Sequence, residues 1–312
     1  MKHAMTLAQL TGATALVAAL SLAACGGGGG YDNINQVPPG DGGGGAPPSV
    51  IDLRTQNAHG LALRSDGSVL AWGRNVDGQL GDGTTTDRQA PVVVAGPGSA
   101  SGIAAGSFHS LIVRPDGSVA GFGNGLSHQL GSAAAARQAV PLAIAGLSGV
   151  KRVRAGSNFS LALTEDGHVY AWGNNLRGQL GNGSTGESGV PTAIAALNNI
   201  TDIHAGDAFA MALKSDGSVW VWGQNLAGEI DSTPSASDLK HALQVSGLSG
   251  VTAIAAGDLH ALALRQDGTV VVWGNNDYGQ LGLGHKIRQA GRCKCPALPG
   301  PRGSTRVACR AW

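Results

Sequence analysis

The sequence has little of what most catalytic and nucleic-acid-binding proteins carry. Only 13% of its 312 residues are charged and 4% are aromatic, and residues 51–285 contain no cysteine. A net charge of +1 provides no basic footprint for a nucleic acid. The zinc motif His-Glu-x-x-His, the nucleophile elbow Gly-x-Ser-x-Gly and a phosphate loop ending in Gly-Lys-Ser/Thr are all missing. We therefore expect no enzyme activity, no cofactor, no metal site and no nucleic-acid partner.

Glycine is the residue that the chain has in excess. Its 51 glycines indicate many tight turns, which favours an all-β repeat protein over a helical one. The near-neutral total also hides an asymmetry in charge. Residues 51–285 hold 13 Lys/Arg against 18 Asp/Glu, whereas residues 286–312 hold seven Lys/Arg and no acid. The end of the chain therefore differs in kind from its main part.

Residues 1–24 predict an export signal. Lys2 gives a basic start, an apolar stretch follows, and small residues precede Cys25. The sequence Leu-Ala-Ala-Cys at 22–25 resembles a bacterial lipobox, which implies that residues 1–24 are removed and that Cys25 carries a lipid anchor. An ordinary signal peptide with an incidental cysteine is the alternative. The Gly- and Pro-rich residues 25–49 predict a flexible tether, and the glycine at position 26 resembles an outer-membrane sorting signal if the host is Gram-negative.

One segment recurs five times along residues 50–285. The stretch "AWGRNVDGQLGDGT" at 71–84 returns as "AWGNNLRGQLGNGS" at 171–184 and in three further copies. Asp-Gly pairs begin at 66, 116, 166, 216 and 267, and the apolar runs on both sides of them predict β-hairpins. A strand before each hairpin, such as 101–106, and one after the long loop, such as 91–96, make each unit a four-stranded sheet that must stack on its neighbours. The aromatic-glycine pairs of the repeat are Trp72-Gly73, Phe122-Gly123, Trp172-Gly173, Trp222-Gly223 and Trp273-Gly274.

Radial stacking of four-stranded sheets builds a β-propeller. The pattern AAGxxHxLxLxxDGxVxxWGxNxxGQLG, complete from Ala255 to Gly282, resembles the RCC1 repeat of the regulator-of-chromosome-condensation family. The resemblance covers residues 51–285 and implies an all-β propeller. Family members typically have seven blades, whereas about five are found here, so the ring is expected to be incomplete. We expect the repeated aromatic side chains to pack between blades and the glycines after them to allow a tight turn.

The loop after each aromatic-glycine pair could be a cation site or a turn. A calcium site needs several converging oxygen ligands, but Asp77 becomes Ser127, Arg177 and Ala227 in the next copies, so we expect turn structure. From the strand order, these loops share one face with turns such as 106–108, and the Asp-Gly turns lie on the other face. Variable loops on a rigid scaffold suit binding, with drift in unconstrained loops as the alternative. The candidate contact residues are Arg74, Asp77, His128, Arg177, Asp277 and Tyr278.

One repeat position holds either histidine or phenylalanine. His59, His109 and His260 occupy it in three copies, and Phe159 and Phe209 occupy it in the other two. A position that accepts both side chains is expected to pack in the core. A catalytic or ligand-binding role should break the repeat pattern instead.

The sequence favours a lipid-anchored propeller at the cell envelope that binds another protein or a surface polymer without catalysis. One alternative is inhibition of a periplasmic or secreted enzyme such as a β-lactamase, as the resemblance to some bacterial relatives implies. A second is nucleotide exchange on a small GTPase, implied by the family name, although the even repeat spacing leaves no room for the wedge that the founding member inserts. A third is a glycan-active enzyme, which would show turnover where a binder shows only saturation.

Residues 286–312 break the repeat. Basic residues, proline and three cysteines replace the alternating apolar pattern. One interpretation is a genuine basic tail in which Cys293 and Cys295 hold a metal or form disulfides. The other is a frameshift beyond which the true chain continues as more blades. We expect the segment as given to be disordered, and, if the chain truly ends here, we expect the fifth blade to lack its fourth strand.

Overall fold

The computed structural model describes residues 47–132, 136–226, 228, 237–286 and 289–295, the last of these by backbone alone. The chain divides into two compact units, Met1–Pro48 and Ser49–Trp312. The expected export signal, the expected lipid site at Cys25 and nearly all of the expected tether lie outside the described residues, as does 296–312.

In the described part of the chain, twenty strands form five antiparallel sheets of four strands each, and each sheet uses its strands in sequence order. The first blade is β1 (Val50–Gln56), β2 (His59–Arg64), β3 (Val69–Gly73) and β4 (Arg88–Val93). The second is β5 (Gly102–Ala105), β6 (His109–Val113), β7 (Val119–Gly123) and β8 (Gln138–Ile144), and the third is β9 (Val150–Ala155), β10 (Phe159–Thr164), β11 (Val169–Gly173) and β12 (Ser188–Ala193). The fourth is β13 (Ile200–Ala205), β14 (Phe209–Lys214), β15 (Val219–Gly223) and β16 (Leu239–Gln244), and the fifth is β17 (Val251–Ala256), β18 (His260–Arg265), β19 (Val270–Gly274) and β20 (Gln289–Cys295).

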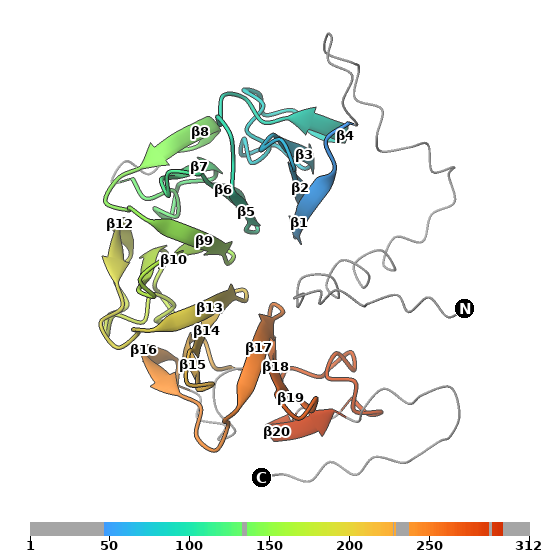
Figure 1. Cartoon of the computed structure of the whole chain (residues 1–312), viewed down its shortest axis with the longest axis vertical. Coiled ribbons are helices and arrows are strands. Elements are labelled where there is room, and N and C mark those ends of the chain that lie inside the picture. The colour runs from blue at the N-terminus through green and yellow to red at the C-terminus, as the bar shows by residue number, and fades with distance from the viewer. Residues whose placement is uncertain (1–46, 133–135, 227, 229–236, 287–288, 296–312) are drawn as a thin grey trace, which may run out of the picture. The chain divides into compact units, whose positions relative to one another are not determined.

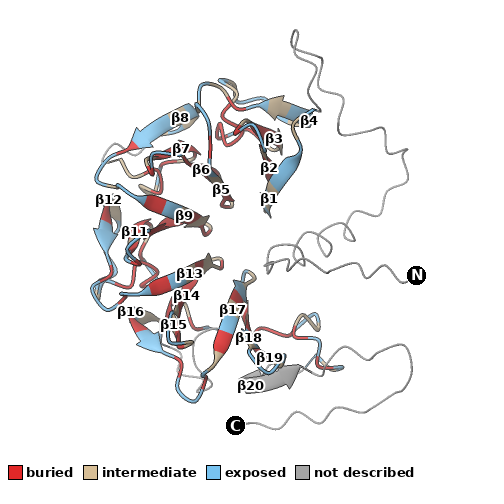
Figure 2. Ribbon diagram, viewed as in Figure 1, coloured by how far each residue is buried: buried red, intermediate tan, exposed pale blue. Residues whose placement is uncertain are grey.

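Within the second unit, the five sheets follow one another around an arc, and β1, β5, β9, β13 and β17 are the innermost strands (Figure 1). Buried residues concentrate in the middle strands and between sheets, whereas the outer strands β8, β12 and β16 are largely exposed (Figure 2). Four of the five hydrophobic clusters among the described residues join two neighbouring sheets; one contains Leu61 and Leu63 of the first blade with Ile103, Ile112 and Phe122 of the second. The predicted all-β propeller of five four-stranded blades is confirmed.

The Asp-Gly pairs close the central hairpins, as the sequence predicts. In the first blade Leu61 pairs with Ala71 and Leu63 with Val69. Asp66 Oδ1 accepts hydrogen bonds from the amide and the hydroxyl of Ser68, at 3.0 and 2.6 Å. Gly67 adopts φ +80°, a conformation that side-chain-bearing residues rarely take. Local turn chemistry therefore sets the register of each hairpin.

The glycine after each repeated aromatic residue ends the third strand at a point of close contact. Gly73 has φ +100°, and a Cβ built there would lie 2.3 Å from the carbonyl oxygen of Ala58. The four equivalent glycines have φ between 101° and 104°. Both the backbone conformation and the lack of space exclude a side chain at this position.

The repeated aromatic residues lie between blades. Trp172 Nε1 donates a hydrogen bond of 2.9 Å to the carbonyl of Gln129 in the preceding blade, and Trp222 does the same to Gln179 at 2.8 Å. Both indoles are fully buried. Trp72 of the first blade is half-buried, because within the described residues no blade precedes it.

The expectation that the fifth blade lacks its fourth strand is wrong. Residues 289–295 form β20, which pairs antiparallel with β19 in the register of the other outer strands, with Val272 opposite Cys293 and Gly274 opposite Gln289. Pairing of backbone groups needs no alternating apolar side chains. An outer strand that buries no side chain, such as β4 in the first blade, therefore has no apolar alternation that the sequence must show. The expected Cys-x-Cys metal or disulfide site falls on residues whose side chains are not described.

Candidate binding face

The loops after the third strands and the turns before the second strands lie together at one end of the sheets. Backbone hydrogen bonds join them in every blade, such as Arg74 N to Ala58 O at 2.8 Å and Asn124 N to Phe108 O at 2.8 Å. The Asp-Gly turns close the opposite end. We call the first end the loop face; it comprises residues 57–58, 107–108, 157–158, 207–208 and 258–259 with 74–79, 124–129, 174–179, 224–226 and 275–280.

A buried asparagine organises the repeated loop from inside. Asn75 Oδ1 accepts from the amide of Leu80 at 2.9 Å, while its Nδ2 donates to the carbonyls of Thr84 and Thr86 and to Asp82 Oδ1. The same amide bond recurs from Leu180 to Asn175 and from Leu281 to Asn276. Among the described residues, no group of three or more His, Cys, Asp or Glu is placed to hold a metal ion. The side chain of Asn75 therefore holds this loop as a turn structure.

Four aliphatic side chains project from the loop face at one repeat position. Val76, Leu126, Leu176 and Leu226 are between 49% and 68% exposed. In the fifth copy the aligned residue is Asp277, and the adjacent Tyr278 is 88% exposed. Each of these residues lies in an otherwise polar loop, so the apolar surface is displayed to solvent rather than buried in a core.

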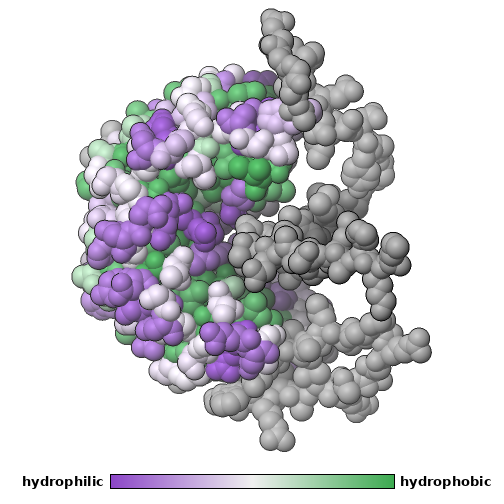
Figure 3. Space-filling view, in the orientation of Figure 1, coloured by the Kyte–Doolittle hydropathy of each residue, from purple (hydrophilic) through white to green (hydrophobic). Residues whose placement is uncertain are grey.

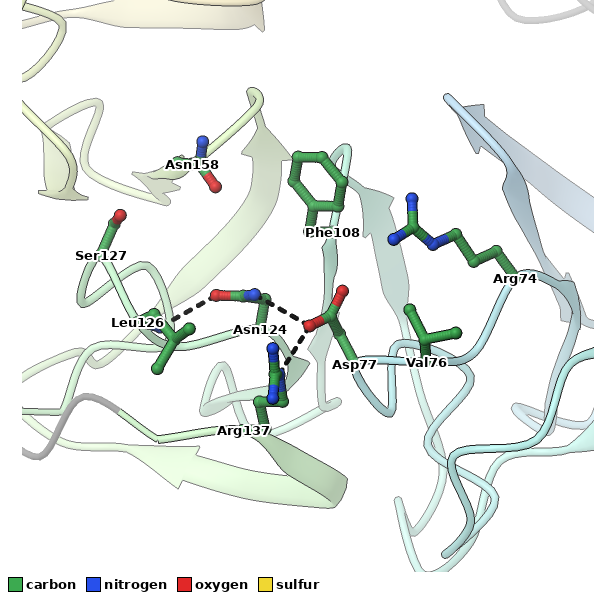
Figure 4. Close-up of a pocket in the computed structure, with 9 residues that line it drawn as sticks. All are labelled: Arg74, Val76, Asp77, Phe108, Asn124, Leu126, Ser127, Arg137 and Asn158. Atoms are coloured by element: carbon green, nitrogen blue, oxygen red, sulfur yellow. Dashed lines mark hydrogen bonds and ion pairs between the residues drawn. The ribbon is translucent and has the colours of Figure 1, made fainter.

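A groove of about 450 Å³ opens on the loop face where the loops of the first and second blades meet. Arg74 and Val76 stand on one side and Leu126 and Ser127 on the other, with Phe108 at one end (Figure 4). The remaining lining residues are Asp77, Asn124, Arg137 and Asn158. The groove thus has a mixed lining, in which three apolar residues lie among six polar or charged ones.

Arg74 and Phe108 depart from the repeat at this groove. The positions equivalent to Arg74 hold Asn124, Asn174, Gln224 and Asn275. The positions equivalent to Phe108 hold Ala, Asn, Ala and Leu in the other four blades. The Arg74 guanidinium lies over the Phe108 ring, 5.5 Å from its centroid. The two residues that differ from the repeat therefore contact each other.

The arginine leaves a hydrogen bond unmade. In three other blades the asparagine at this position accepts a hydrogen bond from the glutamine five residues later; Gln179 Nε2 donates to Asn174 Oδ1 at 2.8 Å. Gln79 is fully buried, and its Nε2 has no partner among the described residues. An unsatisfied buried donor is rare in native proteins and calls for a reason.

Two of the predicted contact residues form ion pairs between blades. Arg137 Nε lies 2.7 Å from Asp77 Oδ1, and Asn124 Nδ2 donates to the same oxygen at 3.0 Å. Two blades further on, Arg177 lies 3.3 Å from Asp238. Here the loop supplies the base and the residue before the outer strand supplies the acid, the reverse of the first pair. Asp77 and Arg177 thus clamp adjacent blades, and Asp77 does not present a free carboxylate.

The other predicted contact residues have separate surroundings. His128 adopts φ +61° and its Nδ1 lies 3.1 Å from the carbonyl of Ser132. Asp277 Oδ2 accepts from Asn275 Nδ2 at 3.0 Å, and Tyr278 extends into solvent. Of the six, the groove gathers Arg74 and Asp77. Sequence reasoning missed Val76, Leu126 and Phe108, which an alignment of the five copies would expose as apolar residues in polar loops.

A second polar cluster lies on the inner strands, away from the loop face. Asp202 accepts from Arg152 and lies 3.8 Å from Arg154 and 3.6 Å from His204. Burial opposes its ionisation, but the bond and charge of His204 and the charges of both arginines outweigh burial and hold its pKa below the usual range. Burial, then the charge of Arg54, lowers the pKa of Arg154 to about 10. Figure 3 shows hydrophilic residues gathered over β9, which carries both Arg152 and Arg154.

Comparisons with known proteins agree with this fold. A family model for the RCC1-like domain matches residues 25–311. Human E3 ubiquitin-protein ligase HERC2 is 48% identical over 52 residues, which are 16% of this chain and 1% of that protein. The structure of Prp20p from Saccharomyces cerevisiae, described with its binding to Gsp1p and histones, is 25% identical with a TM-score of 0.72, over 80% of this chain and 64% of that one.

Human WBSCR16 has the same fold, with a TM-score of 0.72 and 24% identity over 82% of this chain and 69% of its own. The chain spans about 1% of the length of the curated relatives it matches. The five repeats, their register and the match over nearly the whole sequence lead to one conclusion: this chain belongs to the RCC1-like domain family.

Proposed function

We propose that this protein is a binding scaffold whose loop face captures a partner protein. RCC1-like propellers typically serve binding or regulatory roles rather than catalysis. The observation that carries the proposal is the recurrence of an exposed aliphatic residue at one loop position in four blades. Exposed apolar surface framed by polar residues is typical of protein–protein contact sites.

The proposal is tested by replacing exposed aliphatic side chains of the loop face with serine. A variant with Leu126→Ser, Leu176→Ser and Leu226→Ser should fold as the parent does, because all three residues are exposed. After cross-linking in cells, it should retain far less of any co-purified partner. The matched control replaces three exposed valines of the outer strands, Val93→Ser, Val140→Ser and Val190→Ser. Equal retention in both variants would refute binding through the loop face.

We further propose that the scaffold acts at the cell envelope, exported by residues 1–24 and anchored by lipid on Cys25. The basic start, the apolar run and the Leu-Ala-Ala-Cys sequence support this. A tether of residues 25–49 would let the propeller reach a partner away from the bilayer. Within the described part of the chain, no helix has the length and apolarity that a membrane span requires.

The anchor is tested separately from the binding face. Cells fed an alkyne-labelled fatty acid should incorporate the label into the parent protein and not into Cys25→Ala. The variant should also leave the membrane fraction. Labelling that persists in Cys25→Ala would rule out this anchor and leave the loop-face proposal untouched.

A further inference from the structure

We propose that the groove between the first two blades binds an extended segment of a partner protein in which an Asp or Glu side chain neighbours an aliphatic residue. This inference rests on the proposed function and names the kind of segment that the loop face captures. The carboxylate would pair with Arg74, and the aliphatic side chain would lie among Val76, Leu126 and Phe108.

The charge argument comes from the setting of Arg74. Among the described residues, its guanidinium contacts the Phe108 ring and no carboxylate. The neighbouring Arg137 is already paired with Asp77. A planar guanidinium that stacks on an aromatic ring keeps its edge free for two parallel hydrogen bonds to a carboxylate. The unmatched charge in the groove is therefore positive, and its complement is an acidic side chain.

The departure from the repeat supports a role for this arginine beyond packing. The asparagine found at this position in three other blades satisfies the buried glutamine of its loop, whereas Arg74 leaves Gln79 Nε2 without a partner in the described residues. Proteins break their own structural rules mainly at functional sites. Phe108 departs from the repeat in the same groove, so the two changes support one site.

The apolar and neutral polar groups indicate a peptide rather than a small anion. Val76 and Leu126 are both about half exposed and line the groove together. The Ser127 hydroxyl and the Asn158 amide nitrogen also line it and have no partner in the described residues. These groups can bind the backbone of an extended chain while the aliphatic side chains hold its apolar residue.

The test is a selection followed by a binding measurement. Random dodecapeptides displayed on phage are selected on the immobilised full chain, and the consensus peptide is labelled for fluorescence anisotropy. We expect an acidic residue beside Leu, Ile or Val in the consensus. Arg74→Asn and Phe108→Ala should each weaken binding at least tenfold, and changing the peptide acid to its amide should weaken it similarly. In Arg74→Asn, the acid-to-amide change should have little further effect.

Two controls separate binding from folding. Lys151→Asn removes one positive charge at an exposed position of β9 away from the groove, and its affinity should stay within twofold of the parent. Arg74→Asn should melt at or above the temperature of the parent, because it restores an acceptor for Gln79. A variant that loses the peptide while keeping or gaining thermal stability has lost a contact and not its fold.

The remaining outcomes overturn the proposal. Failure to enrich any peptide, a consensus without an acidic residue, or unchanged affinity in Arg74→Asn would each do so. If Arg74→Asn leaves peptide binding unchanged while the triple serine variant loses its partner, the groove proposal fails and the loop face stands. If the serine variant keeps its partner, the proposed function fails whatever the peptide does.

Discussion

Arg74 and Gln79 illustrate how one residue can lower stability while placing a half-buried charge in the groove. Gln79 is buried without a partner for its Nε2 in the described residues, whereas its counterparts Gln129, Gln179 and Gln280 each donate to an asparagine. Leaving a buried donor unsatisfied costs about 1–3 kcal/mol. Arg74 and Phe108 are both half-buried, so their contact recovers about 0.5–2 kcal/mol, which is on average less than this cost. The arginine is therefore a net local cost to folding.

Replacing Arg74 with asparagine should raise the free energy of unfolding by about 1 kcal/mol, because the asparagine supplies the missing acceptor. The matched reverse change, Asn174→Arg in the third blade, should lower it by a similar amount by leaving Gln179 unpaired. Urea denaturation of both variants measures the two effects. Destabilisation by Arg74→Asn would mean that the unmade bond is not what distinguishes the first blade.

The His/Phe position pairs with a second position in the next blade. His59 Nε2 lies 3.0 Å from Ser110 Oγ and His109 Nε2 lies 2.9 Å from Ser160 Oγ, while both serine hydroxyls donate to backbone carbonyls. Phe159 and Phe209 share hydrophobic clusters with alanines, Ala210 and Ala261, at the serine position. Each of these interfaces between blades therefore holds either a polar His–Ser pair or an apolar Phe–Ala pair. Because the two residues of a pair come from different blades, both must be of the same kind.

Buried histidines make the stability depend on pH. Burial lowers the pKa of His59 to about 4, and burial together with the charge of His59 lowers that of His109 to about 3. In the unfolded chain each histidine binds a proton near pH 6.5, whereas in the folded chain it stays neutral. The stability that the two neutral histidines contribute is therefore complete above pH 6.5 and falls as the pH drops towards their folded pKa values. Each histidine contributes a slope of about 1.4 kcal/mol per pH unit in that window.

The double variant His109→Phe with Ser160→Ala copies the apolar pair of the next interface. It should fold, and it should reduce the pH slope of unfolding between pH 6 and 5 by about 1.4 kcal/mol per unit. Urea melts at pH 5, 5.5 and 6 give this slope. An unchanged slope would show that His109 is not held neutral in the folded state.

At the scale of strands and loops, two ion pairs join adjacent blades through the same two repeat positions. The loop position holds the acid in one pair, Asp77, and the base in the other, Arg177. The Asp77 side chain is 6% exposed in its pair with Arg137, whereas the Arg177 side chain is 49% exposed in its pair with Asp238. A buried carboxylate that loses its partner costs more than an exposed pair contributes. Each carboxylate keeps one hydrogen-bond donor when its arginine is removed, Asn124 Nδ2 for Asp77 and the amide of Asn225 for Asp238. The difference between the two ion pairs therefore rests on the deeper burial of the Asp77 side chain, which is 6% exposed against 18% for Asp238.

We therefore expect Arg137→Ala to destabilise the protein by about 1–3 kcal/mol and Arg177→Ala by less than about 1 kcal/mol. Thermal melts of the two variants at low and at high salt measure the difference. If the two variants lose equal stability, the burial of Asp77 does not increase the cost of removing its arginine.

The elements that could be predicted from sequence are those with strong local signals. Asp-Gly turns and alternating apolar strands placed the hairpins, and a glycine with φ near +100° marks the end of each third strand. The strand β20 was missed because its sequence, QAGRCKC, has no apolar alternation, and it is held by backbone pairing to β19. Propensity carries little information where pairing with an existing edge decides the structure.

At the scale of the whole molecule, the groove could not be read from any one repeat. It forms only when Arg74 and Val76 of the first blade meet Phe108 and Leu126 of the second, some thirty to fifty positions apart (Figure 4). The sequence did place the loops on one face by strand order, and that placement holds in the structure. It missed the aliphatic residues because each one alone is an ordinary exposed side chain.

The two faces of the propeller differ in the surface they offer to a partner. The loop face carries the four aliphatic residues and the groove, whereas the opposite face presents Asp-Gly turns in which the aspartates are tied to their own backbone. The hydroxyl of the serine two residues later, and then its amide, hold the pKa of Asp66, Asp116 and Asp216 below the usual value. The turn aspartates thus stabilise the hairpins.

The central claim, that the loop face is the binding surface, is tested most directly by photo-cross-linking from each face in living cells. A photoreactive phenylalanine analogue is placed at Leu176 on the loop face or at Asp166 on the opposite face, both exposed positions. The account predicts a discrete partner adduct from position 176 and little or none from position 166. Adducts of equal yield from both positions, or from position 166 alone, would contradict it.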